Sequence, residues 1–127
     1  MYKRILVAYD GSEHAKKAVE HAVGLAKALG SALFVITVAT DPSQVALERA
    51  RKTAEEAAKA IASAGLEAEV EVRNGAPATE ILNYAEEKEA DLIVMGSRGL
   101  SAIQRLVLGS VSQAVASRAK VPVLIVK

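Results

Sequence analysis

Short apolar runs alternate with longer helix-like stretches along the whole chain, and this alternation limits the possible fold more than any other feature. Four runs are rich in Val, Ile and Leu and lie at 5–9, 32–38, 92–95 and 121–126, and a fifth strand-like run at 66–73 alternates apolar residues with Glu. Strands that alternate with helices predict a parallel sheet covered by helices on both faces. No linker or internal repeat interrupts the pattern. We therefore expect one doubly wound α/β domain that spans residues 1–127.

Capping residues predict where the helices begin. Ser12 follows the first run and is expected to cap a helix over 13–29, which Gly30 closes. Asp41 and Pro42 favour an N-cap followed by proline at the first position of a helix that reaches about residue 64. Pro77 is expected to begin a helix that ends near residue 89. Glutamates alternate with Ala and Val in the run at 66–73, so one face or edge of that strand is expected to meet water.

The segment after the run at 92–95 carries a glycine pattern. It reads GSRGLSAIQRLVLGS, in which nine residues separate the pair Gly96 and Gly99 from Gly109 and Ser110. Open α/β sheets bind nucleotides where strands give way to loops, and glycine lets the backbone approach a ligand closely. A helix that begins near Ser110 would point unpaired N–H groups and its positive dipole end at this loop. The pattern therefore predicts a phosphate site, and it lacks the lysine of a P-loop.

Charge and composition exclude several other classes of function. Sixteen Lys plus Arg against fifteen Asp plus Glu give a formal net charge of +1, so no net field attracts nucleic acid or an anionic membrane. The chain has no cysteine, which excludes disulfides and thiolate metal sites. It shows neither a signal-peptide pattern nor an apolar run of about 20 residues that could span a bilayer. We expect a cytoplasmic protein without nucleic-acid or membrane partners.

Three segments together resemble the universal stress protein family: the start Tyr2–Ser12, the glycine pattern, and the ending Val121–Val126. The resemblance covers essentially the whole chain. It implies a five-stranded parallel sheet in the order 3-2-1-4-5 and a homodimer. The six apolar residues at 121–126 would then form an edge strand, and pairing with the same strand of a second copy would cover that edge. The complete glycine pattern implies the nucleotide-binding branch of the family.

The resemblance also implies a role for each matching residue. Asp10 would face the ribose and metal side of the nucleotide, and Ala8 would line the floor of the site. The backbone of Val38 would meet the adenine, and Met95 would lie beside this base. Gly96 and Gly99 would let the loop fold over ribose and phosphate. The phosphates of ATP, bridged by Mg²⁺ or Mn²⁺, would be held by amides and hydroxyls of Gly109, Ser110, Val111 and Ser112. Arg98 and Arg105 flank this loop and could also reach phosphate.

One segment departs from the family pattern. Only Ala39 and Thr40 separate Val38 from the expected helix start at Asp41, whereas many members carry a longer segment there. A shorter wall leaves the adenine pocket more open.

Several alternatives stay open on the residues alone. The chain could be a nucleotide-binding regulatory protein, or a dimeric interaction module whose site is empty. An ATPase has little support, because Asp10 alone is recognisable as a base for water, so hydrolysis would be slow. A flavodoxin-like carrier or a receiver domain fits the alternation but not the late glycine pattern. His14 and His21 are interpreted as a solvated helix surface rather than a metal site.

Overall fold

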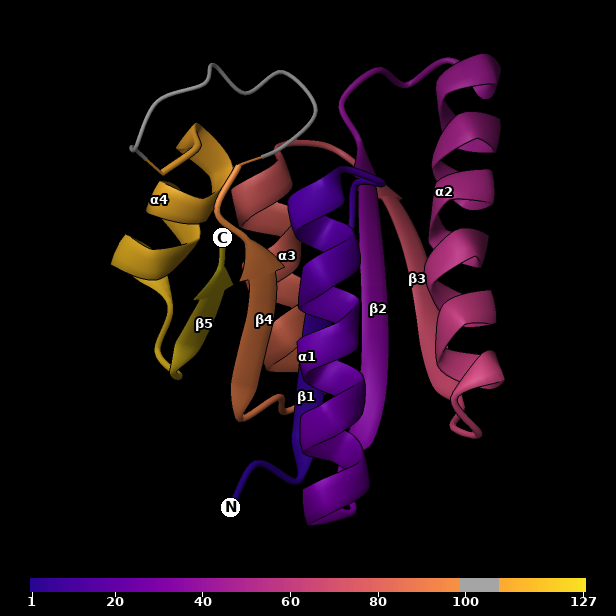
Figure 1. Cartoon of the computed structure of the whole chain (residues 1–127). Helices are drawn as coiled ribbons and strands as arrows, with labels where there is room; N and C mark the ends of the chain where they lie inside the picture. Colours follow the sequence, from indigo (N-terminus) through magenta and orange to yellow (C-terminus); the bar gives the residue numbers. More distant parts are fainter. Residues whose placement is uncertain (99–107) are drawn as a thin grey trace.

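The chain forms one five-stranded parallel sheet in the order β3-β2-β1-β4-β5 (Figure 1). The computed structural model describes residues 1–98 and 108–127. The strands are β1 (Arg4–Ala8), β2 (Ala32–Ala39), β3 (Ala68–Asn74), β4 (Leu92–Gly96) and β5 (Val123–Val126). The central strand β1 pairs in parallel with both β2 and β4. The predicted doubly wound sheet and its strand order are confirmed.

Within the described residues, two helices cover each face of the sheet. On one face α1 (Glu13–Leu29) and α2 (Gln44–Ser63) pack over a core cluster that includes Ile5 and Val7 of β1. On the other face α3 (Pro77–Glu87) and α4 (Ser110–Arg118) pack over a second cluster that includes Leu6. The alternation of these three β1 side chains between the clusters follows from the two-residue period of a strand.

The boundaries predicted for α1 are confirmed. Ser12 is the N-cap, and its Oγ accepts a hydrogen bond from the Ala15 backbone N–H at 3.2 Å. Gly30 ends the helix with φ of 70°, and its N–H donates to the Ala26 carbonyl at 2.8 Å. A left-handed residue at this position is a common helix terminator, and glycine adopts it without steric cost.

The predicted start of the second helix is wrong. Ser43, not Asp41, is the N-cap of α2, and its Oγ accepts from the Ala46 N–H at 3.1 Å. Asp41 instead accepts from the Ser43 N–H at 2.9 Å, which forms a small turn before the helix. Both residues are good cap formers, so the sequence offered two starts. The turn places Pro42 outside the helix.

Three other element ends also shift by about two residues. The third strand begins at Ala68 rather than Leu66, and α3 ends at Glu87, because Glu89 already has φ of 53°. The last strand begins at Val123 rather than Val121. Pro122 has no N–H to donate to a ladder, although its carbonyl accepts from the Ile93 N–H at 3.0 Å.

The edge strand β3 is partly exposed to solvent, as predicted. Val70 is 37% exposed, and Arg73 holds Glu87 through two hydrogen bonds of 2.6 and 2.9 Å. The same guanidinium bonds to Glu71 at 2.7 Å and lies 5.1 Å from the ring centre of Tyr84. Such bidentate contacts fix the pairing geometry more than a point charge would. No helix among the described residues is long and apolar enough to cross a bilayer.

Candidate functional site

The strand ends β1, β2 and β4 and the start of α4 meet at one end of the sheet, which we call the carboxyl edge (Figure 1). In the figure this is the upper end, above which the chain passes from β2 to α2. Ligands bind at this end of open α/β sheets because loops and helix N-termini converge there. Most of the predicted site residues come together at this edge.

The turn after β1 is built around Asp10 and Gly11. Gly11 has φ of 84°, a conformation that residues with a Cβ rarely adopt. The Asp10 Oδ1 accepts from the Ser12 N–H at 3.0 Å, while the Asp10 side chain stays exposed. The turn therefore holds a carboxylate in solvent at the carboxyl edge, immediately before the helix cap.

The three residues predicted to lie around the adenine and the floor of the site, Ala8, Val38 and Met95, lie on the same face of the sheet. Ala8 is in register with Met95 across β1 and β4, and with Ile36 across β1 and β2. Val38 follows Ile36 by two residues and so shares its face. Ala8 and Val38 are half-buried, and Met95 is 5% exposed, all within the cluster under α3 and α4. They form an apolar strip across the ends of three neighbouring strands.

Gly96 ends β4 under the first turn of α1. A Cβ built on Gly96 would lie 2.7 Å from the His14 Cβ, 2.8 Å from the His14 carbonyl carbon and 2.9 Å from the Ala15 nitrogen. Real Cβ atoms essentially never come this close to another heavy atom. Glycine is therefore needed here for the close approach of helix and strand, whatever the following loop does.

Ser97 joins three elements. Its N–H donates to the Val126 carbonyl of β5 at 2.8 Å. Its carbonyl accepts from the Gly109 N–H at 2.7 Å and from the Ser112 Oγ at 2.8 Å, both at the start of α4. Its Oγ lies 2.7 Å from the His14 Nδ1 of α1. Ser97 is 4% exposed, so these bonds are shielded from water.

The first turn of α4 contains an exposed residue, Ser110, and a buried one, Ser112, whose hydroxyl is already hydrogen-bonded. Gly109 is the N-cap with φ of −65° and ψ of 160°, and it has no side chain with which to cap the helix. Ser110 is exposed, Val111 is half-buried, and Ser112 is 3% exposed with its hydroxyl donated to the Ser97 carbonyl. The first N–H groups of a helix have no partner within it. They carry the partial positive charge that attracts an anion.

The remaining predicted site residues have different positions. Arg98 is half-buried, and its carbonyl accepts from the Ser12 Oγ at 3.4 Å, which brings the loops after β1 and β4 together. Gly99 and Arg105 lie outside the described residues. After Val38, the Ala39 carbonyl accepts from the Asn74 Nδ2 at 3.1 Å and from the Gly75 N–H at 2.9 Å, so β3 supports the segment there. The predicted two-residue connection is wrong, because α2 begins at Gln44 and residues 39–43 therefore separate Val38 from the helix.

The interpretation of the two histidines as a solvated helix surface is wrong for His14 and confirmed for His21. His14 is half-buried and touches both Gly96 and Ser97, whereas His21 is exposed. Sequence reasoning missed His14 because its partners lie more than 80 residues away in the chain. Its spacing of four and eight residues from Ala18 and Ala22, which belong to the apolar stripe of α1, is a weak signal that His14 also turns inward. In the described part of the chain, no group of three or more His, Cys, Asp or Glu is placed to hold a metal ion.

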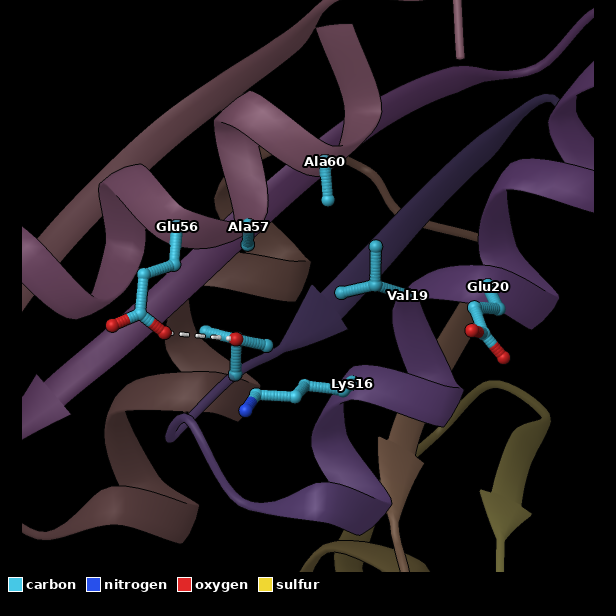
Figure 2. A pocket seen from close by; sticks show the side chains of 7 residues that line it. Lys16, Val19, Glu20, Glu56, Ala57 and Ala60 are labelled. Carbon is cyan, nitrogen blue, oxygen red and sulfur yellow. Dashed lines mark hydrogen bonds between the residues drawn. The ribbon is translucent and has the colours of Figure 1, made fainter. Parts of the chain in front are cut away.

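A separate cavity of about 310 Å³ lies between α1 and α2, away from the apolar strip (Figure 2). Small side chains line its base, including Val19, Ala57 and Ala60. The Tyr9 hydroxyl donates to the Glu56 Oε1 at 3.2 Å. Burial, followed by the hydrogen bond to Glu56 and the charge of Glu56, raises the pKa of Tyr9 to about 12. The cavity is a gap between two alanine-rich helices with a polar rim.

Comparison with known proteins places the chain among relatives over its full length. The model of the Universal stress protein family matches residues 1–127. A universal stress protein of Thermus aquaticus is 44% identical over 138 residues and is covered completely, as is this chain.

Solved structures share the fold. A universal stress protein in complex with cAMP is 32% identical, with a TM-score of 0.81 and coverage of 99% of this chain and 97% of that one. The universal stress protein from Archaeoglobus fulgidus in complex with dAMP is 26% identical, with a TM-score of 0.83 and coverage of 99% and 98%.

Proposed function

Because the chain belongs to the universal stress protein family, we propose that it binds ATP at the carboxyl edge and acts as a nucleotide-dependent regulatory protein. The observation that carries this proposal is the start of α4, where a glycine N-cap precedes the first N–H groups of the helix. Ser97 and Arg98 join this helix end to the turn after β1, and Val111 packs against the cluster that holds the apolar strip. Two related structures were solved with the adenine nucleotides cAMP and dAMP. Their complexes support adenine recognition in this fold.

Each part of the carboxyl edge suits one part of the nucleotide. The apolar strip of Ala8, Val38 and Met95 offers a surface for the adenine ring. The N–H groups of Ser110, Val111 and Ser112 suit the phosphates, with Gly109 allowing close approach. Gly96 and Gly99 would let the loop that follows β4 fold over the ribose and phosphates, and the Arg98 side chain would add a positive charge.

The donor chemistry also fits a divalent cation. An exposed carboxylate beside a phosphate-binding helix start is a common way to hold Mg²⁺, which prefers oxygen ligands and keeps several waters. Asp10 is the residue that would hold Mg²⁺ or Mn²⁺ together with the phosphates. The cation would neutralise phosphate charge when bound. Asp10 itself would orient the metal and the ribose.

Bound nucleotide would stabilise one arrangement of the loop, which a protein partner then reads. The alternative is an interaction module whose surface acts without nucleotide. Mass spectrometry of small molecules released from the purified, denatured protein distinguishes the two. We expect ATP in near-stoichiometric amount, whereas protein free of any nucleotide, and unable to bind added ATP, would favour the interaction module.

Removing the charge of Asp10 should weaken nucleotide binding in a magnesium-dependent way. Asp10→Asn keeps an oxygen to accept from the Ser12 N–H but loses the anionic ligand, so we expect about a tenfold loss of affinity with Mg²⁺. The loss should nearly vanish with a chelator. Calorimetric titration under both conditions measures it. If Asp10→Asn and Asp10→Ala lower only the melting temperature, with the magnesium dependence unchanged, Asp10 merely shapes the turn.

We further propose a homodimer through β5, which is an edge strand with half-buried Val123, Leu124 and Ile125. Leu124 faces the α1 side and Ile125 the α3 and α4 side. Leu124→Lys or Ile125→Lys, whichever places the charge in the interface, should convert the dimer to a monomer. Light scattering at micromolar concentration would measure this change in mass. Val70→Lys on the opposite edge is the matched control and should leave the dimer intact. A monomeric wild type contradicts this proposal.

A further inference from the structure

His14 is held firmly at the junction of α1 and β4. It lies in the first turn of α1, directly after the Ser12 cap and Glu13. Its Cβ and backbone contact Gly96 so closely that no side chain fits between them. The imidazole is half-buried, and Nδ1 lies 2.7 Å from the Ser97 Oγ. The ring therefore has little freedom to leave Ser97.

The hydrogen bond from His14 reaches the start of α4 through one residue. Ser97 is 4% exposed, and its carbonyl accepts from the Gly109 N–H at 2.7 Å and the Ser112 Oγ at 2.8 Å. These are the N-cap and the first turn of α4. Because His14 holds the Ser97 side chain in place, it also restricts the orientation of the Ser97 carbonyl, which accepts the bonds from α4. An unbroken chain of contacts thus connects the imidazole with the helix end.

We propose that His14 is a positioning residue for the first turn of α4 and thereby sets the nucleotide affinity of the carboxyl edge, an inference that rests on the proposed function. Helix N–H groups bind phosphate best when they already point at a common centre, because binding then costs less ordering of the protein. The bond from His14 to Ser97 supplies this order before the ligand arrives. His14 itself need not touch the nucleotide.

Two substitutions at His14 separate the hydrogen bond from simple packing. His14→Leu fills similar space without a polar atom, whereas His14→Asn keeps a polar atom near the position of Nδ1. A lost hydrogen bond of ordinary strength corresponds to about a five- to tenfold change in affinity. We expect that loss of affinity for magnesium-ATP in His14→Leu, and recovery of most of it in His14→Asn. His21→Leu, an exposed site on the same helix, is the control and should bind like the wild type.

A Ser97→Ala background tests whether the effect passes through Ser97. There, His14→Leu should cause no further loss of affinity, because the bond is already broken. Equal affinity of wild type and His14→Leu overturns the inference. A full effect of His14→Leu in the Ser97→Ala background, or equal losses in His14→Leu and His14→Asn, also overturns it.

Amide hydrogen exchange at Gly109 in the nucleotide-free protein provides a readout that needs no ligand. The Gly109 N–H donates to the Ser97 carbonyl, so its exchange should become several-fold faster in His14→Leu and stay unchanged in His21→Leu. A wild type that binds no ATP would contradict the proposed function, and the exchange measurement would then decide the positioning role alone. Unchanged exchange at Gly109 in His14→Leu overturns that role.

Discussion

Adding one methyl group at Gly96 is expected to lower the free energy of unfolding by about 3 kcal/mol, near the upper end for overpacking a well-filled interior. The new Cβ of Gly96→Ala would lie within 2.9 Å of the His14 Cβ, the His14 carbonyl carbon and the Ala15 nitrogen. Two of these atoms are backbone, so α1 and β4 must separate to make room. Chemical denaturation of the wild type and Gly96→Ala measures the difference.

Gly24→Ala is the matched control for this substitution. Gly24 lies within α1, and a Cβ built there meets nothing within 4 Å. Alanine should therefore raise the free energy of unfolding by about 0.5–1 kcal/mol, because it restricts the unfolded chain and favours the helix. Equal stability of Gly96→Ala and the wild type would show that the two elements can part at little cost.

Replacing Gly109 with valine should lower the affinity for magnesium-ATP by at least about a hundredfold. Two hydrogen bonds to a charged phosphate, each worth about 1.5–3 kcal/mol, would be lost when the branched side chain keeps the nucleotide from the helix end. The fold should survive, because φ of −65° and ψ of 160° are accessible to valine. Calorimetry gives the affinity, and a thermal melt confirms that the protein is folded.

The combination of those two measurements separates the possible outcomes for Gly109→Val. Weak binding by a folded protein supports phosphate contact at the start of α4. Equal ATP affinity in the wild type and Gly109→Val would contradict it. Gly24→Ala again serves as the control, since it exchanges a glycine within α1, where a Cβ meets nothing within 4 Å, and should leave ATP affinity unchanged.

The general fold could be predicted because its signals are local in the sequence. The alternation of apolar runs and helical stretches indicates a parallel sheet, and Ser12 with Gly30 marks both ends of α1. The order of the strands came from the family resemblance, since alternation alone does not specify it. The start of α2 was wrong because Asp41 and Ser43 compete as caps, and only the hydrogen bonds distinguish them.

The candidate site was less predictable, because its decisive contacts join distant segments. The pattern of glycines indicates a loop, but the need for glycine at 96 arises from α1, which is about 80 residues earlier in the chain. The bonds of Ser97 to His14 and Ser112 are invisible to any local pattern for the same reason. Hydroxyl and imidazole groups acquire their partners only when the sheet brings β1 and β4 side by side.

The strand order also determines when the carboxyl edge can exist during folding. Ile5 of β1 pairs with Leu33 after one intervening helix, but it pairs with Leu92 only after three helices and two strands. Contacts between distant segments form late because the chain between them must be ordered first. We therefore expect half of the candidate site, from Asp10 to Val38, to form with the first βαβ unit, and the other half to join it later. A nucleotide bound as proposed would then stabilise the finished molecule, because its site is complete only once both halves have met.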